Sequence, residues 1–174
     1  MTNRYLSIYL KDHLAMAKGG VDFMRRVAES NSNNPLGDEL HQMSEELEEE
    51  RDTLSDLLDR LEVDPSQLKM AGAWLAEKAG RFKFNGEFTR YSPLSRVLEL
   101  EFLMAAVQAR KGLWKLILDA RKLYPVLADV PARRLEVQAD GQLLRLETMH
   151  QRAVRQMLKT GQQQEQEERH SDRP

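Results

Sequence analysis

The chain has 174 residues, and its 26 basic and 28 acidic side chains leave a formal net charge of only −2. It contains no cysteine, which excludes disulfides, zinc–thiolate sites and thiol nucleophiles. The charged start MTNRYLSIYLKDH is unlike a secretory signal, and no window has the apolar length of a membrane span. We therefore expect a soluble, cytoplasmic protein with no membrane contact.

Prolines mark the expected helix starts along the chain. Pro35, Pro65, Pro93 and Pro131 each follow a plausible capping residue, and proline at the first helical position loses no hydrogen bond. No segment has the alternating pattern of a strand, so the sequence predicts an all-α protein. The expected helices cover about residues 3–30, 35–62, 66–83, 93–122 and 131–159.

The four long helices are predicted to form a bundle. Their apolar residues recur at alternating steps of four and three, the pattern of helices that pack side by side. Short connections make the first two and the last two long helices antiparallel, whereas the long connection between residues 62 and 93 can return the chain to the opposite end. The second and third long helices should then run in the same direction, with a helical crossover between them.

Composition changes near the C-terminus. From residue 160 the segment TGQQQEQEERHSDRP has no apolar side chain to bury. We therefore expect one helical-bundle domain over residues 1–159 and a disordered polar tail over residues 160–174.

Ionisable residues interrupt the apolar stripes at His13, Glu50 and His150. A two-metal carboxylate bundle needs a carboxylate from each of two helices and a Glu-x-x-His pair from each of the other two. Glu147 and His150 form one such pair in the last helix. The candidate metal ligands are Glu50, Glu101, Glu147 and His150, with His13 as a further ligand or a proton carrier.

This ligand pattern is incomplete. Thr53 rather than histidine follows Glu50 by three residues, and His13 stands where a carboxylate is expected. We therefore favour a structural interpretation, in which His13 and His150 are hydrogen-bonded bundle residues and Glu50 lies at a wide or hydrated part of the core. We expect no cofactor. If a metal does bind, we expect iron or manganese. The sequence assigns no catalytic residue.

The crossover offers a second candidate site, with basic residues interleaved among aromatic ones. This composition could bind an anionic partner such as nucleic acid. Alternatively, Phe82, Phe84 and Phe88 pack the crossover onto the bundle while the basic groups reach water. We favour this alternative, because the whole chain is slightly acidic and has no nucleic-acid-binding motif. The basic residues are Lys78, Arg81, Lys83, Arg90 and Arg96.

Two resemblances accompany these patterns. Over about residues 3–159 the long helices and their crossover resemble the ferritin-like superfamily, which implies a four-helix bundle with a long B–C crossover. The departures at Thr53 and His13 put its metal chemistry in doubt. The runs DHLAMAKGGVDFMRRVAE, AWLAEKAGRFKFNG and YSPLSRVLELE are similar to an uncharacterised family of short bacterial helical proteins, a resemblance that implies no activity.

We therefore expect a non-catalytic interaction or regulatory module with a degenerate metal site. Its partner would be another protein or a second copy of the chain. The alternative is a metal-binding carboxylate-bundle oxidase or a metal-storage-like protein. Stoichiometric metal in the purified protein would separate the two.

Overall fold

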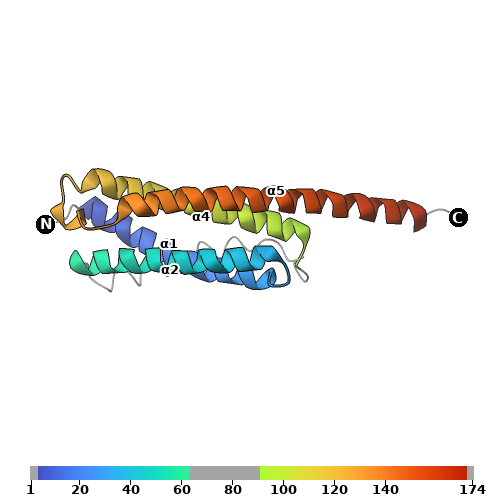
Figure 1. Cartoon of the computed structure of the whole chain (residues 1–174), viewed down its shortest axis with the longest axis horizontal. Helices are drawn as coiled ribbons and strands as arrows, with labels where there is room; N and C mark the ends of the chain where they lie inside the picture. The colour runs from blue at the N-terminus through green and yellow to red at the C-terminus, as the bar shows by residue number, and fades with distance from the viewer. Residues whose placement is uncertain (1–3, 63–90, 172–174) are drawn as a thin grey trace.

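The structure, a computed structural model, describes residues 4–62 and 91–171. Every regular element in this part of the chain is helical, which confirms the all-α prediction. None of these helices is long and apolar enough to cross a membrane. The predicted helix over residues 66–83 lies outside the described residues. The elements are α1 (Arg4–Ser30), α2 (Pro35–Arg60), α4 (Pro93–Ala120), the short 3-10 helix η1 (Pro125–Leu127) and α5 (Ala132–Ser171) (Figure 1).

Side-chain caps explain where α2 and α4 begin. The Asn34 side-chain oxygen accepts a hydrogen bond from the Leu36 N–H at 3.0 Å, and the Ser92 hydroxyl accepts one from the Ser95 N–H at 3.1 Å. A proline follows each cap, at a position where the backbone N–H would have no helical partner. Both helices therefore start where the sequence predicted.

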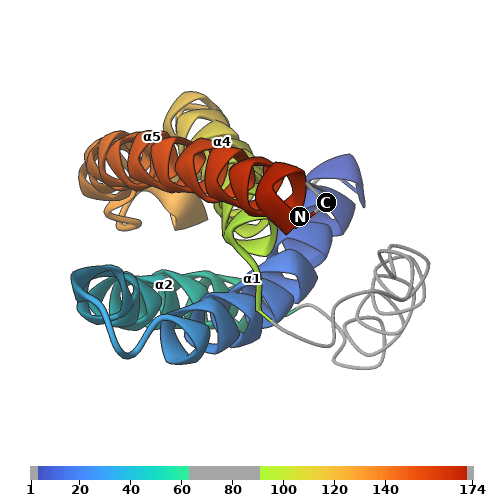
Figure 2. The same cartoon turned by 90° about the vertical axis from the view of Figure 1, so that its right-hand side faces the viewer.

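The four long helices form two antiparallel hairpins, α1–α2 and α4–α5. The chain colours of Figure 1 show that α2 and α4 run in the same direction, as predicted. By contrast, α2 and α5 run in opposite directions, because Glu46 contacts Arg145 whereas Glu50, one turn further along α2, contacts Gln142. Figure 2 shows the two hairpins as layers, and α4 of one layer packs against α1 of the other.

Two clusters of buried apolar side chains fill the space between the hairpins. One includes Met24, Leu40, Met43, Leu100 and Leu103, and the other includes Leu10, Leu54, Leu57, Leu113 and Ile117. On α2 and α4 the boundary between the clusters falls at Glu50 and Arg110, which are both buried. The core is thus divided by charged residues near the middle of these helices.

The last helix is longer than predicted. Instead of ending near residue 159, α5 continues to Ser171, and Figure 1 shows this end projecting beyond the other three helices. The predicted disordered tail covers residues 160–174, whereas residues 160–171 form the end of α5. Glutamine, glutamate and arginine are good helix formers, and adding residues to an existing helix avoids the cost of nucleating a new one.

Candidate functional site in a buried charged layer

Glu50 is the buried carboxylate of α2, with only 2% of its surface exposed. It lies between Leu47 and Leu54 at the four-three spacing of the inward face of the helix. The indole N–H of Trp114 donates a hydrogen bond to Glu50 Oε2 at 3.1 Å, and the Gln142 amide donates one to Glu50 Oε1 at 3.2 Å. Each carboxylate oxygen therefore has a side-chain donor from the opposite hairpin.

Arg110 of α4 supplies the positive charge beside this carboxylate. Its Nη1 lies 3.6 Å from Glu50 Oε2, and its Nη2 donates a hydrogen bond to Gln142 Oε1 at 2.7 Å. Only 8% of Arg110 is exposed. The guanidinium and the carboxylate thus form an ion pair in which Gln142 binds both partners.

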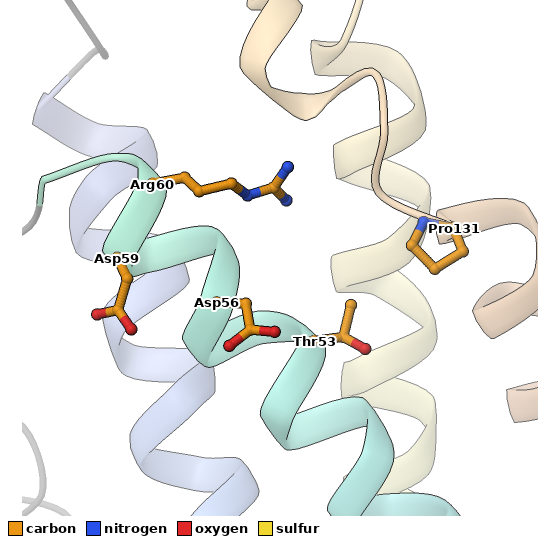
Figure 3. Close-up of a pocket in the computed structure, with 5 residues that line it drawn as sticks. All are labelled: Thr53, Asp56, Asp59, Arg60 and Pro131. Carbon is orange, nitrogen blue, oxygen red and sulfur yellow. The ribbon is translucent and has the colours of Figure 1, made fainter.

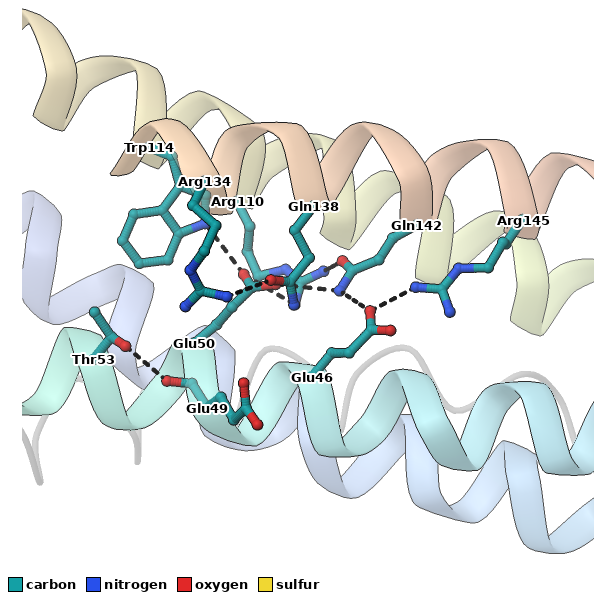
Figure 4. A network of polar contacts seen from close by, with 10 residues as sticks. All are labelled: Glu46, Glu49, Glu50, Thr53, Arg110, Trp114, Arg134, Gln138, Gln142 and Arg145. Atoms are coloured by element: carbon teal, nitrogen blue, oxygen red, sulfur yellow. Dashed lines mark hydrogen bonds and ion pairs between the residues drawn. The ribbon is translucent and has the colours of Figure 1, made fainter. Parts of the chain in front are cut away.

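At the edge of this site the polar contacts continue toward solvent. Gln142 Nε2 also donates to Glu46 Oε2 at 2.9 Å, and Arg145 Nη2 lies 2.5 Å from the same oxygen. Two carboxylates of α2 therefore face two guanidiniums, Arg110 of α4 and Arg145 of α5, across the space between the two hairpins (Figure 4). We call Glu46, Glu50, Arg110, Gln142 and Arg145 the charged layer.

Burial shifts the pKa values of the ion pair in opposite directions. Burial raises the pKa of Glu50, an effect that Arg110 and the hydrogen bonds from Trp114 and Gln142 oppose. Burial lowers the pKa of Arg110, and the negative charges of Glu50 and Glu46 oppose that shift. Each charge of the pair therefore stabilises the ionised form of the other against the desolvation that both undergo.

His13 brings α1 to the same region. It is 6% exposed, and it lines a cavity of about 10 Å³ together with Glu50, Arg110 and Trp114. The centroid of its ring lies 4.5 Å from that of Tyr9. Burial lowers the pKa of His13, and the neighbouring Asp12 opposes this effect. His13 and Glu50 were both predicted to face the interior, and the structure places them at one cavity.

The other predicted metal ligands lie elsewhere. His150 Nε2 is 3.0 Å from Glu101 Oε1, in a pair between α5 and α4 whose carboxylate is exposed. Glu147 is exposed as well. Among the described residues there is no group of three or more histidines, aspartates or glutamates able to hold a metal ion. The structure thus divides the five candidate ligands instead of placing them in one coordination sphere.

The residues around Glu50 do not fit the two-metal site of a carboxylate bundle. Such a site needs several carboxylates and histidines around its cations. Here the charge next to Glu50 is the guanidinium of Arg110, and the adjoining cavity of about 10 Å³ is too small for two metal ions. Arg110 thus provides the positive charge that a metal ion would supply in the alternative interpretation.

Arg110 and Gln142 were not among the predicted site residues. Arg110 lies three residues after Val107 and four before Trp114, both buried, so the four-three spacing of α4 contained the signal. On α5 the prediction placed His150 on the inner seam, whereas the structure buries Gln142 and Met149. Neighbouring residues point about 100° apart around the axis of a helix. An error of one residue in the predicted inner face therefore moves a side chain from the interior to the edge of the bundle.

The predicted anionic-partner surface is only partly described. Lys78, Arg81, Lys83 and Arg90 lie outside the described residues, whereas Arg96 is at the start of α4. Its side chain donates a hydrogen bond to Asn31 Oδ1 at 2.7 Å and another to Gln156 Oε1 at 2.8 Å. Arg96 therefore ties α4 to the end of α1 and to α5.

An open surface hollow lies at the C-terminal end of α2, beside the loop that precedes α5 (Figure 3). Its volume is about 450 Å³, and it is lined by Thr53, Asp56, Asp59, Arg60 and Pro131. No buried side chain lines it, so the charged layer is the better defined of the two polar sites.

Comparison of the chain with protein-family models, with curated proteins and with solved structures found no match.

Proposed function

We propose that the protein is a non-catalytic helical bundle that binds another protein, and that its charged layer serves to join the two hairpins. The proposal is carried by the pairing of Glu50 with Arg110. The carboxylate that could have bound a metal is already neutralised by a side chain of the same protein. This favours a structural role for the layer over the alternative of an oxidase or metal-storage-like protein.

The outer face of α5 is the surface that we propose for the partner. Val137, Leu144 and Leu158 are 57%, 67% and 58% exposed. Their spacing of seven and fourteen residues places them on one side of the helix, opposite Ala139 and Leu146, which are fully buried. Apolar side chains in such a row are typical of a helix face that packs against another helix.

Charge indicates the kind of partner that this face would bind. Arg152 and Lys159, both exposed, lie on one flank of the row, and Arg155 lies within it. An amphipathic helix with apolar residues along its centre and acidic residues at its edge would complement both features. We therefore propose an acidic amphipathic helix as the partner.

We also propose that the complete chain follows a ferritin-like path. The shared direction of α2 and α4 supports this, because the second and third long helices of a ferritin-like bundle also run in the same direction. The ferritin-like path concerns the scaffold alone, since the charged layer lacks the ligands of a two-metal site.

Metal analysis tests the non-catalytic part of the proposal. The protein is reconstituted separately with iron, manganese and zinc, passed over a desalting column and measured by elemental analysis. We expect less than one tenth of an equivalent of each metal. The oxidase or storage alternative would be supported instead if the wild type bound one equivalent of metal, and if both Glu50→Ala and the double variant Glu147→Ala/His150→Ala failed to bind it.

Site-specific photocrosslinking tests the partner surface. A photoreactive amino acid is placed at Leu144, and at Gln108 on the exposed side of α4 as a control. We expect an adduct from position 144 alone, and its loss when Arg152→Glu and Lys159→Glu are added. Equal adducts at both positions, or an adduct that survives the charge reversal, would contradict an acidic partner on α5.

A further inference from the structure

Three buried polar atoms at the small cavity have no hydrogen-bond partner among the described residues. They are His13 Nδ1, Arg110 Nε and Arg110 Nη1. His13 and Arg110 are each more than nine tenths buried, and both line the cavity. Buried polar atoms in native proteins are nearly always hydrogen-bonded to protein or to ordered water. Several of them around one cavity therefore point to a ligand within it.

The size of the cavity limits what this ligand can be. A volume of about 10 Å³ is at the lower limit for a single water molecule. Phosphate, acetate or a hydrated cation would not fit. Leu47, Leu54 and Leu113 form apolar walls of the cavity, and its polar lining residues are His13, Glu50, Arg51, Arg110 and Trp114. The Arg51 side chain is hydrogen-bonded to Asp52 and the Trp114 indole to Glu50.

We propose that this cavity binds one water molecule, which accepts a hydrogen bond from Arg110 and donates hydrogen bonds to His13 Nδ1 and to the Glu50 carboxylate. The guanidinium N–H groups can only donate and the carboxylate can only accept, which sets the orientation of the water. The second O–H of the water is the one that we place on His13, which makes His13 Nδ1 the acceptor and puts the proton of the neutral ring on Nε2.

This water extends the charged layer to α1. Without it, the contacts of the layer join α2 to α4 and α5. The water adds a link from His13 of α1 to both members of the ion pair, so that all four long helices take part. The proposal concerns the interior alone and is independent of the partner proposed for the outer face of α5.

Nitrogen NMR of the histidine rings tests the tautomer. Long-range ¹H–¹⁵N spectra at pH 8 should show an unprotonated Nδ1 and a protonated Nε2 for His13. Water-selective cross-relaxation should also show a bound water, with a residence time longer than nanoseconds, beside His13 and the Trp114 indole. A protonated Nδ1, or the lack of any long-lived water signal there, would overturn the proposal.

A substitution of matched size locates the water. Ala17 lines the cavity, and Ala17→Ser adds one oxygen atom, which is about the size of the water. We expect this variant to lose the bound-water signal while it remains folded by circular dichroism. Ala15→Ser, on the same helix but away from the cavity lining, should retain the signal. Retention in Ala17→Ser would show that the water lies elsewhere.

Discussion

Arg110 Nη1 lies 3.6 Å from Glu50 Oε2, and both side chains are buried between the two hairpins. One residue comes from α2 and the other from α4, which are separated by residues 63–90 in the chain. A buried ion pair of this kind loses much of its Coulomb energy to desolvation, yet an unpaired buried charge is far less stable. The pair therefore favours the native alignment of the hairpins over alignments that would separate the two charges.

A double-mutant cycle measures this coupling. We expect Arg110→Met and Glu50→Gln to lower the free energy of unfolding, Arg110→Met by about 3 to 5 kcal/mol because it leaves a buried carboxylate without a counter-charge. The double variant should lose clearly less than the sum of the single losses. Urea denaturation at pH 7 gives the values, and Arg152→Met, at an exposed position, is the control. Additive losses would contradict a direct interaction.

Titration of His13 should make stability depend on pH. Its pKa is lower in the native state than the ordinary value of 6.5, so the unfolded chain binds more protons between these two values. Stability must therefore fall as the pH falls below about 6.5, with a slope of at most about 1.4 kcal/mol per pH unit. His13→Gln should lack this component, which urea denaturation from pH 8 to 5 would show. Parallel curves for the two proteins would disprove the shift.

Glu50 has the opposite effect on the dependence of stability on pH. Its pKa is raised above 4.5 in the native state, so the native protein binds more protons between 4.5 and the raised value. Its contribution to stability therefore falls as the pH rises through this window. The charges that face these two groups are Asp12 on α1, Glu46 on α2 and Arg110 on α4. Wild type and His13→Gln both retain Glu50. The difference between their profiles of unfolding free energy against pH therefore gives the contribution of His13.

Gln142 should contribute more to stability than an ordinary surface glutamine. It is fully buried, and its amide contacts Arg110, Glu50 and Glu46. Gln142→Leu would remove one hydrogen bond from each of these three charged groups, and we expect a loss of about 2 to 3 kcal/mol. Gln151→Leu, at an exposed position of the same helix, should change the unfolding free energy by less than about 0.5 kcal/mol. Thermal and urea denaturation measure both variants. Equal losses of unfolding free energy in Gln142→Leu and Gln151→Leu would argue against the network.

The two histidines predicted as ligands should differ in their contribution to stability. His150 shares a hydrogen bond with the exposed Glu101, and exposed polar pairs of this kind contribute about 0 to 1 kcal/mol. We therefore expect His150→Ala to lose less than about 1 kcal/mol. His13→Ala removes a buried ring and should lose more, about 2 kcal/mol or above. Urea denaturation of the wild type and both variants at pH 8 gives the two losses.

Two glycines in helices should respond in opposite ways to alanine. A Cβ at Gly37 would lie 2.5 Å from the Asn31 carbonyl oxygen, which is backbone and cannot move aside cheaply. At Gly112 a Cβ would meet nothing within 4 Å. We expect Gly37→Ala to lower the melting temperature and Gly112→Ala to raise stability by about 0.5 to 1 kcal/mol. A tolerated Gly37→Ala would mean that the α1–α2 turn can widen.

Local patterns predicted much of the scaffold. Caps and prolines located the starts of α2 and α4, and the long connection between these two helices predicted that they run in the same direction. The four-three spacing also placed His13 and Glu50 inside the bundle, as found. The last helix extends beyond its predicted end at residue 159, because polar composition there is typical of disorder while the helix propensity of the same residues favours continuation.

The sequence by itself determined the helices and the inward direction of His13 and Glu50, because both follow from a repeat of about 3.6 residues along a single helix. Only the tertiary structure decided which groups meet Glu50. Those groups are Arg110 and Gln142, from helices distant in the chain, and the rotation and axial offset of each helix select them. Such offsets depend on the packing of all four helices together, so a pattern within one helix predicts a buried charge but not its partner.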